Sequence, residues 1–489
     1  MRDWVRRLWV LAALAALALM ATTAVAVAAD SAADEATAAA TAAKGIPFKF
    51  VVYPFELREL ALSARPFSGS GLQSRVDNGV HDSHGVRMRV AKGKMYDFPR
   101  GQSSYGLGNL NSYRLTNDTF YLQRALAQAQ RLVDTHHVGG DAWYYPSYPS
   151  RFRHGRSGEP ITAPYYSALS QGRILLLFAR LAEMTGEARW RSAADHTFAA
   201  FLRPGPRSGP FVVNVDASRY YWLQEWPWPN LAPDCTLNGH ISSLFGLFEY
   251  YMVTRDDRAR ELFRGAVTTV SHYLPAFRRA GWISCYCLAH RATNANYHSI
   301  HVGQLLVLYK MTGSTVFARA ADQFQSDYPK PVVTGVLHVE PGTYTAVRFD
   351  AGDGVTARRT VTVRRATSWG VRLRQRHHGR SAIYLRVSGG RYDGWWLAER
   401  SGRVYLRGFA AQLGYEPART LAIAAGQTFT ALDFKEDGSV RDSVRVDSGD
   451  GLTLAADRRA VVDGVQRVRV SEGELDGYWL PLHRGFVLL

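Results

Sequence analysis

Apolar residues recur at helical spacing from Gly45 to about Tyr328, in pairs of stretches separated by a short polar turn. In the stretch that begins at Leu122, apolar positions fall at i, i+3, i+4, i+7, i+10 and i+11, which is one face of a helix. Most of the turns carry Gly or Asn where a helix C-terminus favours a left-handed residue, followed by Asp, Glu or Ser where the next helix needs an acceptor. The turns are YRLTND (113–118), AEMTGE (182–187), YMVTRD (251–256) and YKMTGS (309–314). We therefore expect four helical hairpins.

Hairpins that repeat in this way stack on their neighbours. Because there are only four, with long non-helical connections, the sequence favours a closed α/α toroid over residues 106–329 rather than an open solenoid, with a central cleft as the substrate site. Residues 45–105 contain Gly, Pro and short β-prone runs such as FKFVVY. They are expected to form a small β-rich portion packed at one end of the toroid.

Beyond Pro329 the pattern changes to short alternating runs broken by Gly and Asp, which is typical of antiparallel β structure. It is also duplicated: TYTAVRF (343–349) returns as TFTALDF (428–434), and LRVSGGRYDGWWL (385–397) returns as VRVSEGELDGYWL (468–480). The sequence therefore predicts two repeated antiparallel β-modules, 330–410 and 411–489. The expected fold class is multidomain α + β.

The N-terminus predicts export. Arg2, Arg6 and Arg7 precede a long apolar run that ends in small residues, so residues 1–29 are interpreted as a signal peptide, with an uncleaved N-terminal membrane anchor as the alternative. Residues 30–44, nearly all Ala, Ser, Thr, Asp and Glu, are expected to be a disordered linker. An extracytoplasmic location, secreted or anchored, follows.

Composition changes this picture in two ways. Lys plus Arg exceeds Asp plus Glu by 59 to 42, a net charge of +17, which favours polyanionic partners. Export makes nucleic acid an unsuitable partner, leaving an acidic polysaccharide; a homodimer is compatible with the sequence. Cys235, Cys285 and Cys287 are too few for a disulfide framework. One bridge from Cys235 and three free thiols both stay open.

Polar and aromatic residues gather in three blocks, each just before or at the start of a helix that would line the toroid. Connections at one end of a helical barrel project their side chains into the same cleft, so the three blocks are expected to meet. The blocks are APYYSALSQG (163–172), YYWLQEWPWPN (220–230) with LNGHISSLFGL (237–247), and CYCLAHRATNANYHSIHVGQL (285–305).

These blocks resemble the D-glucuronyl C5-epimerases that act on heparan-type glycans. That family reads approximately A-P-W-Y-S-A-M-A-Q-G, then E-E-Y-P followed by L-N-G, then Y-D-L-R-H followed by Y-H-x-x-H-x-x-Q-L. In this chain Trp226 stands in place of a tyrosine and Ala289 in place of an arginine. The matching residues, in the family's order, are Pro164, Tyr166, Ser167, Gln171, Glu225, Pro227, Asn238, Gly239, Tyr286, Leu288, His290, Tyr297, His298, His301 and Gln304.

Inverting carbon 5 of a uronic acid requires a proton to leave one face of the ring and another to arrive on the opposite face, so two proton-transfer groups must flank it. Charge that develops on the carboxylate needs donors or cations aimed at it. No cofactor is needed. By resemblance, the catalytic residues are Glu225 on one face, and Tyr286 and Tyr297 on the other. The residues predicted to bind substrate are Tyr166, Gln171, Trp226, Asn238, His290, Arg291, His298, His301 and Gln304.

Each assignment has an alternative. Arg173 competes with Arg291 for the role of the missing family arginine. His298 and His301, three apart on a helix, and His290 lack a further ligand of clear spacing, so no metal is predicted. Arg372, Arg374 and Arg376 alternate along a strand and would share one basic face or a solvated one. A polysaccharide lyase and a non-catalytic glycan-binding protein are the competing functions.

Overall fold

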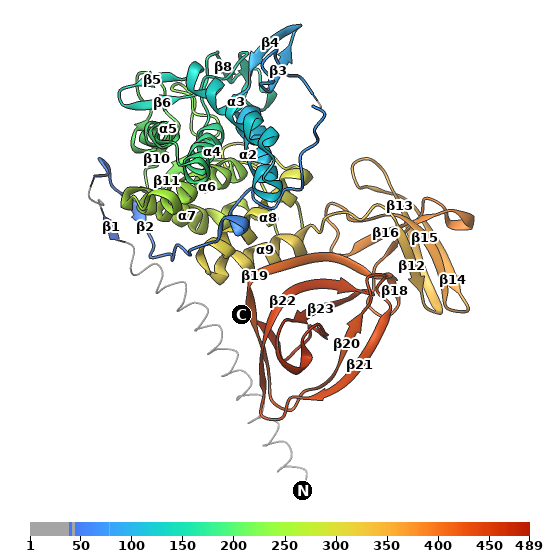
Figure 1. Cartoon of the computed structure of the whole chain (residues 1–489). Helices are drawn as coiled ribbons and strands as arrows, with labels where there is room; N and C mark the ends of the chain where they lie inside the picture. Colours follow the sequence, from blue (N-terminus) through green and yellow to red (C-terminus); the bar gives the residue numbers. More distant parts are fainter. Residues whose placement is uncertain (1–38, 42–44, 78) are drawn as a thin grey trace.

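The computed structural model describes residues 39–41, 45–77 and 79–489 (Figure 1). The predicted export segment, 1–29, and most of the predicted linker, 30–44, lie outside these residues. Within the linker range, strand β1 (Ala39–Thr41) pairs in antiparallel fashion with β2 (Phe50–Val52). None of the helices in the described part of the chain is both long and apolar enough to cross a bilayer.

The four predicted helical hairpins are confirmed. Each pairs two antiparallel helices across a two-residue turn, and the four follow one another between residues 99 and 327 (Figure 1). The helices are α2 (Pro99–Thr116), α3 (Thr119–Thr135), α4 (Ala168–Thr185), α5 (Ala188–Ala199), α6 (Leu237–Thr254), α7 (Asp257–Phe277), α8 (Ala295–Thr312) and α9 (Thr315–Asp327).

A threonine performs the same task in every turn. The hydroxyl of Thr116 donates to the carbonyl of Ser112 one helical turn back, and accepts from the backbone N–H of Asp118, the first residue of the next helix cap. The same two bonds recur at Thr185, Thr254 and Thr312. One side chain therefore serves a helix end and the following helix start, both of which lack intrahelical partners.

The first helices of the hairpins form a row, because α4 contacts α2 and α6, and α6 contacts α8. The tightest crossing is between α4 and α6, where Gly172 faces Gly246. A Cβ atom added at Gly246 would lie 2.2 Å from the carbonyl oxygen of Gly172. Only glycine allows two backbones to approach this closely. The structure shows this row of first helices, and its closure into a toroid stays a prediction.

Helix α2 begins at Pro99, before the predicted boundary at 106. Proline is favoured at the first position of a helix because its missing N–H would be unpaired there. The rest of α2 is rich in Gly, Ser and Asn, which hides the helix from propensity and leaves packing against α3 and α4 to stabilise it. Short elements otherwise connect the helices: η1 (Leu62–Ala64), β3 (Met88–Ala91), β4 (Lys94–Asp97), β5 (His137–Gly139), β6 (Ala142–Tyr144), β7 (Arg151–Phe152), η2 (Arg153–Gly155), β8 (Pro160–Ile161), η3 (Ala200–Leu202), β9 (Pro204–Gly205), β10 (Val213–Val215) and β11 (Tyr221–Leu223).

The chain ends in two seven-stranded sheets whose strand orders are equivalent, β14-β13-β17-β16-β15-β12-β18 and β21-β20-β24-β23-β22-β19-β25. The duplication read from the sequence is thus a duplication of topology, and each sheet has its own apolar core. The first sheet contains β12 (Gly335–Val339), β13 (Gly342–Phe349), β14 (Val355–Val363), β15 (Thr367–Arg376), β16 (Ile383–Ser388), β17 (Trp396–Ala398) and β18 (Val404–Leu406), with η4 at Gly390–Tyr392. The second contains β19 (Phe409–Ile423), β20 (Thr428–Phe434), β21 (Val440–Asp447), β22 (Leu452–Val462), β23 (Val465–Val470), β24 (Trp479–Pro481) and β25 (Phe486–Leu488), with η5 at Gly473–Leu475.

Both β-modules contact the last hairpin; in Figure 1 the second module lies beneath α9 and the first lies to the right of the helices. Asp322 of α9 accepts hydrogen bonds from Tyr415 and Arg419 of β19 and forms an ion pair with Arg459. From the first module, the Arg376 guanidinium donates to the backbone carbonyl of Ser326. Part-buried polar contacts therefore fix the second module to α9, with α8 also packed on β19, whereas the Arg376 contact of the first module is exposed.

The predicted face of three arginines on β15 is wrong. A register shift between Val371 and Leu373 changes which side the following residues face. Arg374 is buried and donates two hydrogen bonds to Glu399, while Arg372 stays exposed. The bulge separates side chains that simple alternation would place together.

Candidate active site

The three residues predicted to be catalytic come together, although they arrive from separate segments. Glu225 follows strand β11, Tyr286 lies in the loop between α7 and α8, and Tyr297 sits in the first turn of α8. The phenol of Tyr286 donates a hydrogen bond of 2.8 Å to Oε2 of Glu225. The rings of Tyr286 and Tyr297 have their centroids 4.4 Å apart. The residues after β11, in the loop before α8 and in the first turn of α8 thus form one compact group.

Trp226 also belongs to this group, through a hydrogen bond to Tyr286. Its indole N–H donates to the phenol oxygen of Tyr286 at 3.2 Å, so that the hydroxyl accepts one bond and donates another. Trp226 and Tyr297 are half-buried, whereas Glu225 and Tyr286 are only 4% and 6% exposed. A ligand therefore has access to the group from the side of Trp226 and Tyr297.

Burial raises the pKa of Glu225 above the ordinary value of a glutamate, and the hydrogen bond from Tyr286 opposes that rise. Burial and the nearby carboxylate raise the pKa of Tyr286. Burial lowers the pKa of Arg173 on α4 to about 10, so its guanidinium is still charged at neutral pH. The site thus combines the Glu225 carboxylate, whose basicity is raised, with the guanidinium cation of Arg173.

Gly239 makes the position of Glu225 possible. A Cβ atom at Gly239 would lie 2.5 Å from Oε2 of Glu225, inside contact distance. The carboxyl group consequently rests against the first turn of α6, whose N-terminal N–H groups favour negative charge. Gly239, in the Asn238-Gly239 pair of the sequence block, therefore has a physical role, which is to leave room for the carboxyl group of Glu225.

Several buried polar atoms on α4, α6 and α8, and at the N-cap of α6, have no hydrogen-bond partner within residues 39–41, 45–77 and 79–489. Almost all buried polar groups in proteins are paired, so atoms left over beside a site are suited to a polar ligand or water. Hydroxyls and carboxylates of a sugar would satisfy this set. The atoms are Arg173 Nε, Thr236 Oγ1, Asn238 Oδ1, His301 Nε2 and Gln304 Oε1.

Other predicted binding residues are used inside the fold. The Gln171 amide donates to the carbonyls of Trp143 and Thr197, which ties α4 to its hairpin partner. Gln304 donates to the carbonyl of Asn238 and to Ser242, which ties α8 to α6. These amides hold the row of helices together, and only the free oxygen of Gln304 remains for a ligand.

His298 and His301 both turn Nδ1 toward Ser284, at 2.9 Å from its hydroxyl. His298 also bonds the carbonyl of Phe324 through Nε2. Burial lowers the pKa of His301 to about 3, so this histidine is neutral. The pair therefore positions the loop before α8. Tyr166 bonds His137 at 2.8 Å, and Arg291 is exposed.

Sequence reasoning missed three neighbours of this site. The ring of His154 meets the face of Tyr286 edge-on, with centroids 5.2 Å apart. The guanidinium of Arg151 lies over the ring of Trp226 at 4.2 Å, and Tyr165 packs on the same indole. Tyr165 stood beside the predicted Tyr166, but Arg151 and His154 lie in an irregular loop that has no periodicity to reveal its direction.

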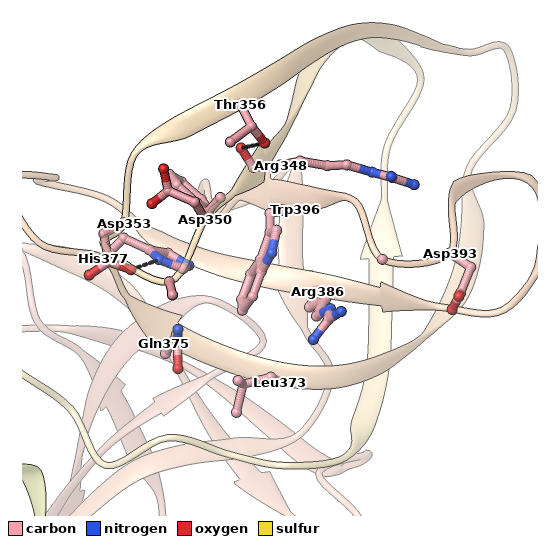
Figure 2. Close-up of a pocket in the computed structure, with 13 residues that line it drawn as sticks. Arg348, Asp350, Asp353, Thr356, Leu373, Gln375, His377, Arg386, Asp393 and Trp396 are labelled. Carbon is pink, nitrogen blue, oxygen red and sulfur yellow. Dashed lines mark hydrogen bonds and ion pairs between the residues drawn. The ribbon is translucent and has the colours of Figure 1, made fainter.

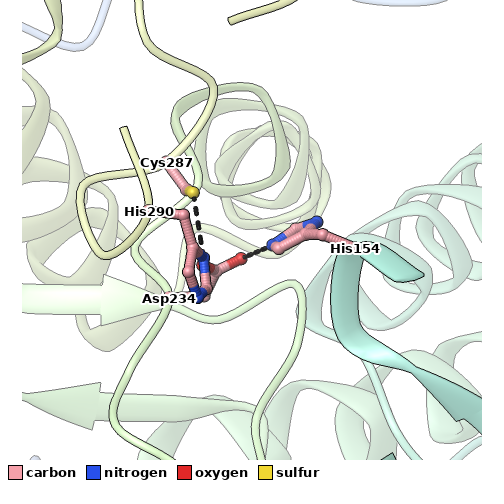
Figure 3. Close-up of side chains that lie close together, drawn as sticks. All are labelled: His154, Asp234, Cys287 and His290. Carbon is pink, nitrogen blue, oxygen red and sulfur yellow. Dashed lines mark hydrogen bonds and ion pairs between the residues drawn. The ribbon is translucent and has the colours of Figure 1, made fainter. Parts of the chain in front are cut away.

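A polar cluster lies behind the site. His154, Asp234, Cys287 and His290 place one potential ligand atom each within 4.8 Å of one another (Figure 3). Asp234 is fully buried and bonds both histidines. All three cysteines are free thiols, which decides between the two alternatives left open by the sequence. Burial raises the pKa of Cys235 to about 12.

A cavity of about 630 Å³ opens in the first β-module, away from the helix ends (Figure 2). His377 stacks on Phe349, meets Trp396 edge-on, and bonds Asp353 at 2.6 Å. Trp396 is thus mostly buried, while its neighbour Trp395 lies under the guanidinium of Arg348. The adjacent residues Trp396 and Trp395 thus have an interior and a surface role, respectively.

The geometry defines a buried carboxyl–phenol pair at the starts of stacked helical hairpins, which is a site for proton transfer. Residues 142–326 match the family model described as the D-glucuronyl C5-epimerase C-terminus. This part of the chain, from β6 to α9, is therefore similar to the family whose sequence blocks it resembles. The match supports an epimerase-type function on a carbohydrate.

Other relatives are more distant. An uncharacterized protein of Methanocaldococcus jannaschii is 27% identical over 153 residues, which are 31% of this chain and 49% of that protein. The chain thus spans about half the length of this curated relative. Cellobiose 2-epimerase from Bacillus thermoamylovorans aligns with a TM-score of 0.36 at 10% identity, over 46% of this chain and 58% of its own. Unsaturated glucuronyl hydrolase from Streptococcus agalactiae aligns with a TM-score of 0.34 at 14% identity, over 47% and 58%.

Proposed function

We propose that this protein inverts carbon 5 of D-glucuronate residues within an acidic polysaccharide, producing L-iduronate residues. The observation that carries the proposal is the buried Glu225 carboxyl, bonded to the phenol of Tyr286 and bordered by the ring of Tyr297. The family model that residues 142–326 match supports the same chemistry. The polymer acts as substrate, and the chain's own side chains supply both proton transfers.

In the proposed reaction the C5–H bond breaks, its electron pair moves into the adjacent carboxyl group, and the proton passes to a base. A second proton then reaches carbon 5 from the opposite face as the electron pair returns, so there is no net redox change. The raised pKa of Glu225 makes its carboxylate a stronger base than an exposed one. No redox cofactor is needed for this sequence of steps.

Glu225 and Tyr286 are assigned to the same face of the sugar. Groups joined by a 2.8 Å hydrogen bond lie too close together to flank a sugar ring. Tyr286 therefore acts through Glu225, by holding its orientation and sharing its proton. Tyr297 is the remaining candidate for the opposite face, and because its ring contacts that of Tyr286, the sugar meets its hydroxyl and does not lie between the two rings. This differs from the initial expectation, which grouped both tyrosines against Glu225.

The substrate carboxylate gains charge when C5–H breaks, and cations near that position lower the barrier. Arg173 is suited to this role, because its Nε atom is buried without a partner among the described residues and the charge of Glu225 raises its pKa, against the effect of burial. Trp226 is half-buried beneath the guanidinium of Arg151 and offers the part of its indole that stays exposed to a sugar ring. Asn238 and Gln304 offer free acceptor oxygens for hydroxyls.

The test is incubation of the full chain with a non-sulfated glucuronate polymer in deuterated water. Deuterium at carbon 5 without chain cleavage is the expected result. An unsaturated product that absorbs in the ultraviolet would identify a lyase, which abstracts the same proton and then expels the group at carbon 4. Polymer binding without either change would identify a glycan-binding protein.

The same proposal places the protein outside the cytoplasm, where such polymers are met, with residues 1–29 directing export or anchoring it to the membrane. Its net charge of +17 suits an acidic polymer as partner.

A further inference from the structure

We propose that His154, Asp234, Cys287 and His290 bind one zinc-type divalent cation, forming a structural site behind the active-site group. Two imidazoles, a carboxylate and a thiolate are the donors that zinc uses in closed four-ligand sites. The cluster comes from three segments: His154 from η2, Asp234 from the loop before α6, and the other two residues from the loop before α8.

The spacing of the four donors suits tetrahedral coordination. Bonds of about 2.0–2.3 Å that meet at the tetrahedral angle put ligand atoms roughly 3.3–3.8 Å apart. In this structure Nδ1 of His290 lies 3.0 Å from Oδ1 of Asp234 and 3.5 Å from Sγ of Cys287. The contact between Nε2 of His154 and Oδ2 of Asp234 also has to lengthen, by about 1 Å, to reach this spacing. Small side-chain shifts are enough to receive the ion.

The surroundings of His290 match those of a metal-bound histidine. Its other nitrogen, Nε2, lies 2.7 Å from Oε1 of Glu159. A carboxylate that accepts from the far nitrogen of a ligating imidazole is the usual support for such ligands, because it fixes the tautomer and orients the ring. Glu159 is itself held by Arg153.

Cys287 and His290 form a Cys-x-x-His turn. The backbone N–H of Arg291 bonds the carbonyl of Cys287, and Arg291 adopts a left-handed φ of 49°. His154 and Cys235, which follows Asp234, also have positive φ values, 51° and 53°. Non-glycine residues rarely adopt this conformation. Each of the three ligand-bearing loops therefore holds such a residue at or beside its ligand.

Charge balance favours a divalent ion. Asp234 is fully buried and Cys287 is buried, while the side chains of His154 and His290 are 17% and 10% exposed. One carboxylate, one thiolate and two neutral imidazoles carry two negative charges, which Zn²⁺ cancels. A closed set of four protein ligands leaves no position for substrate, so the role is structural.

The bound ion would position the active site. The loop that contains Asp234 follows directly from Glu225 and Trp226, and Tyr286 precedes Cys287 by one residue. Tyr286 is also in edge-to-face contact with His154. One ion would thus connect the segments that carry Glu225 and Tyr286.

The experiment uses Co²⁺ as a spectroscopic substitute in the full chain, after removal of metal with a chelator. We expect about one Co²⁺ per chain, a thiolate-to-metal charge-transfer band in the near ultraviolet and intense visible bands of tetrahedral geometry. Zn²⁺ should displace the Co²⁺ and abolish the colour. This readout does not depend on epimerase activity, so it stands whether or not the proposed function does.

Cys287→Ser and Cys235→Ser are a matched pair, since Cys235 is a nearby thiol outside the cluster. Cys287→Ser should remove the charge-transfer band and weaken binding at least about tenfold, whereas Cys235→Ser should retain both. Less than about 0.1 Co²⁺ per wild-type chain after dialysis would overturn the proposal. So would a band that survives in Cys287→Ser. If either variant fails to fold, the wild-type stoichiometry and spectrum decide.

Discussion

Two carboxyl groups with little exposure, Glu225 in the helical region and Glu399 in the first β-module, have different partners. In the first β-module, Glu399 receives two hydrogen bonds from the guanidinium of Arg374, at 3.1 and 2.6 Å. In the helical region, Glu225 has no ion pair with any residue that the structure describes, and its main partner is a phenol. Pairing removes the cost of burying a charge, whereas an unpaired carboxyl keeps its proton-transfer capacity. Glu399 thus stabilises the fold through its ion pair, whereas Glu225 is the side chain proposed to react.

The strongest way to break this comparison is Glu225→Gln, which removes the base but keeps the shape. We expect deuterium incorporation at carbon 5 to fall at least about 10³-fold, because proton abstraction loses its acceptor. Residual exchange within tenfold of the wild type would remove Glu225 from the mechanism. The same substitution at Glu399 is the control, and should leave exchange within about twofold.

Glu225→Gln should also change the pH dependence of stability. Burial raises the folded-state pKa of Glu225, so the native state binds more protons than the unfolded state between the unfolded and folded pKa values. The wild-type contribution is therefore complete below the unfolded pKa and is lost as the pH rises through the folded one. Melting temperatures of the variant should fall less across this window than those of the wild type.

Glu399→Gln should have the opposite profile, with stability lost and exchange kept. Arg374 has only 3% of its side chain exposed, so removing the carboxylate leaves a buried guanidinium without its counter-charge. Breaking a buried pair costs about 3 kcal/mol or more. Hydrogen exchange of the backbone amides of β15 and β16 should report the loss locally. Unchanged protection there would show that the pair contributes little.

The fold was predictable where local pattern decides it. Helical periodicity and turn residues predicted the four hairpins, and the internal repeats predicted two β-modules. The start of α2 at Pro99 was missed because its Gly-rich sequence depends on packing. The bulge near Arg372 was missed because a one-residue shift leaves no mark on an alternating pattern.

The site was predictable in part for a related reason. Glu225 and Tyr286 meet as the sequence blocks suggested. Gln171 and His298, in the same blocks, turn instead to neighbouring backbone groups, because a sequence block does not fix which neighbour each side chain on a helix will face. Asp234 joins His290 across 56 residues, a contact that no spacing rule indicates.

Helix packing provides a third test, on the frame that holds the site. Gly246→Ala places a Cβ atom 2.2 Å from the carbonyl oxygen of Gly172, so α4 and α6 must separate. We expect a loss of about 2 kcal/mol in the free energy of unfolding. Gly303→Ala on α8 meets nothing within 4 Å and should stabilise by up to about 1 kcal/mol. Denaturant unfolding followed by helix signal measures both. Equal effects of the two changes would argue against the close α4–α6 contact.

The smallest expected effect is that of Arg372→Gln. Arg372 is an exposed arginine on β15, the same strand that carries the buried Arg374. Arg372 is 58% exposed and lies 3.9 Å from Asp393, so its loss should change stability by less than about 0.5 kcal/mol. If the β-modules guide the polymer through charge, this substitution should slightly weaken binding to a glucuronate polymer and reduce its dependence on salt. Binding measured over a range of salt concentrations gives both quantities. Wild-type binding that is insensitive to salt would contradict charge guidance and shift the main contact to aromatic stacking at Trp226, because stacking is not screened by ions.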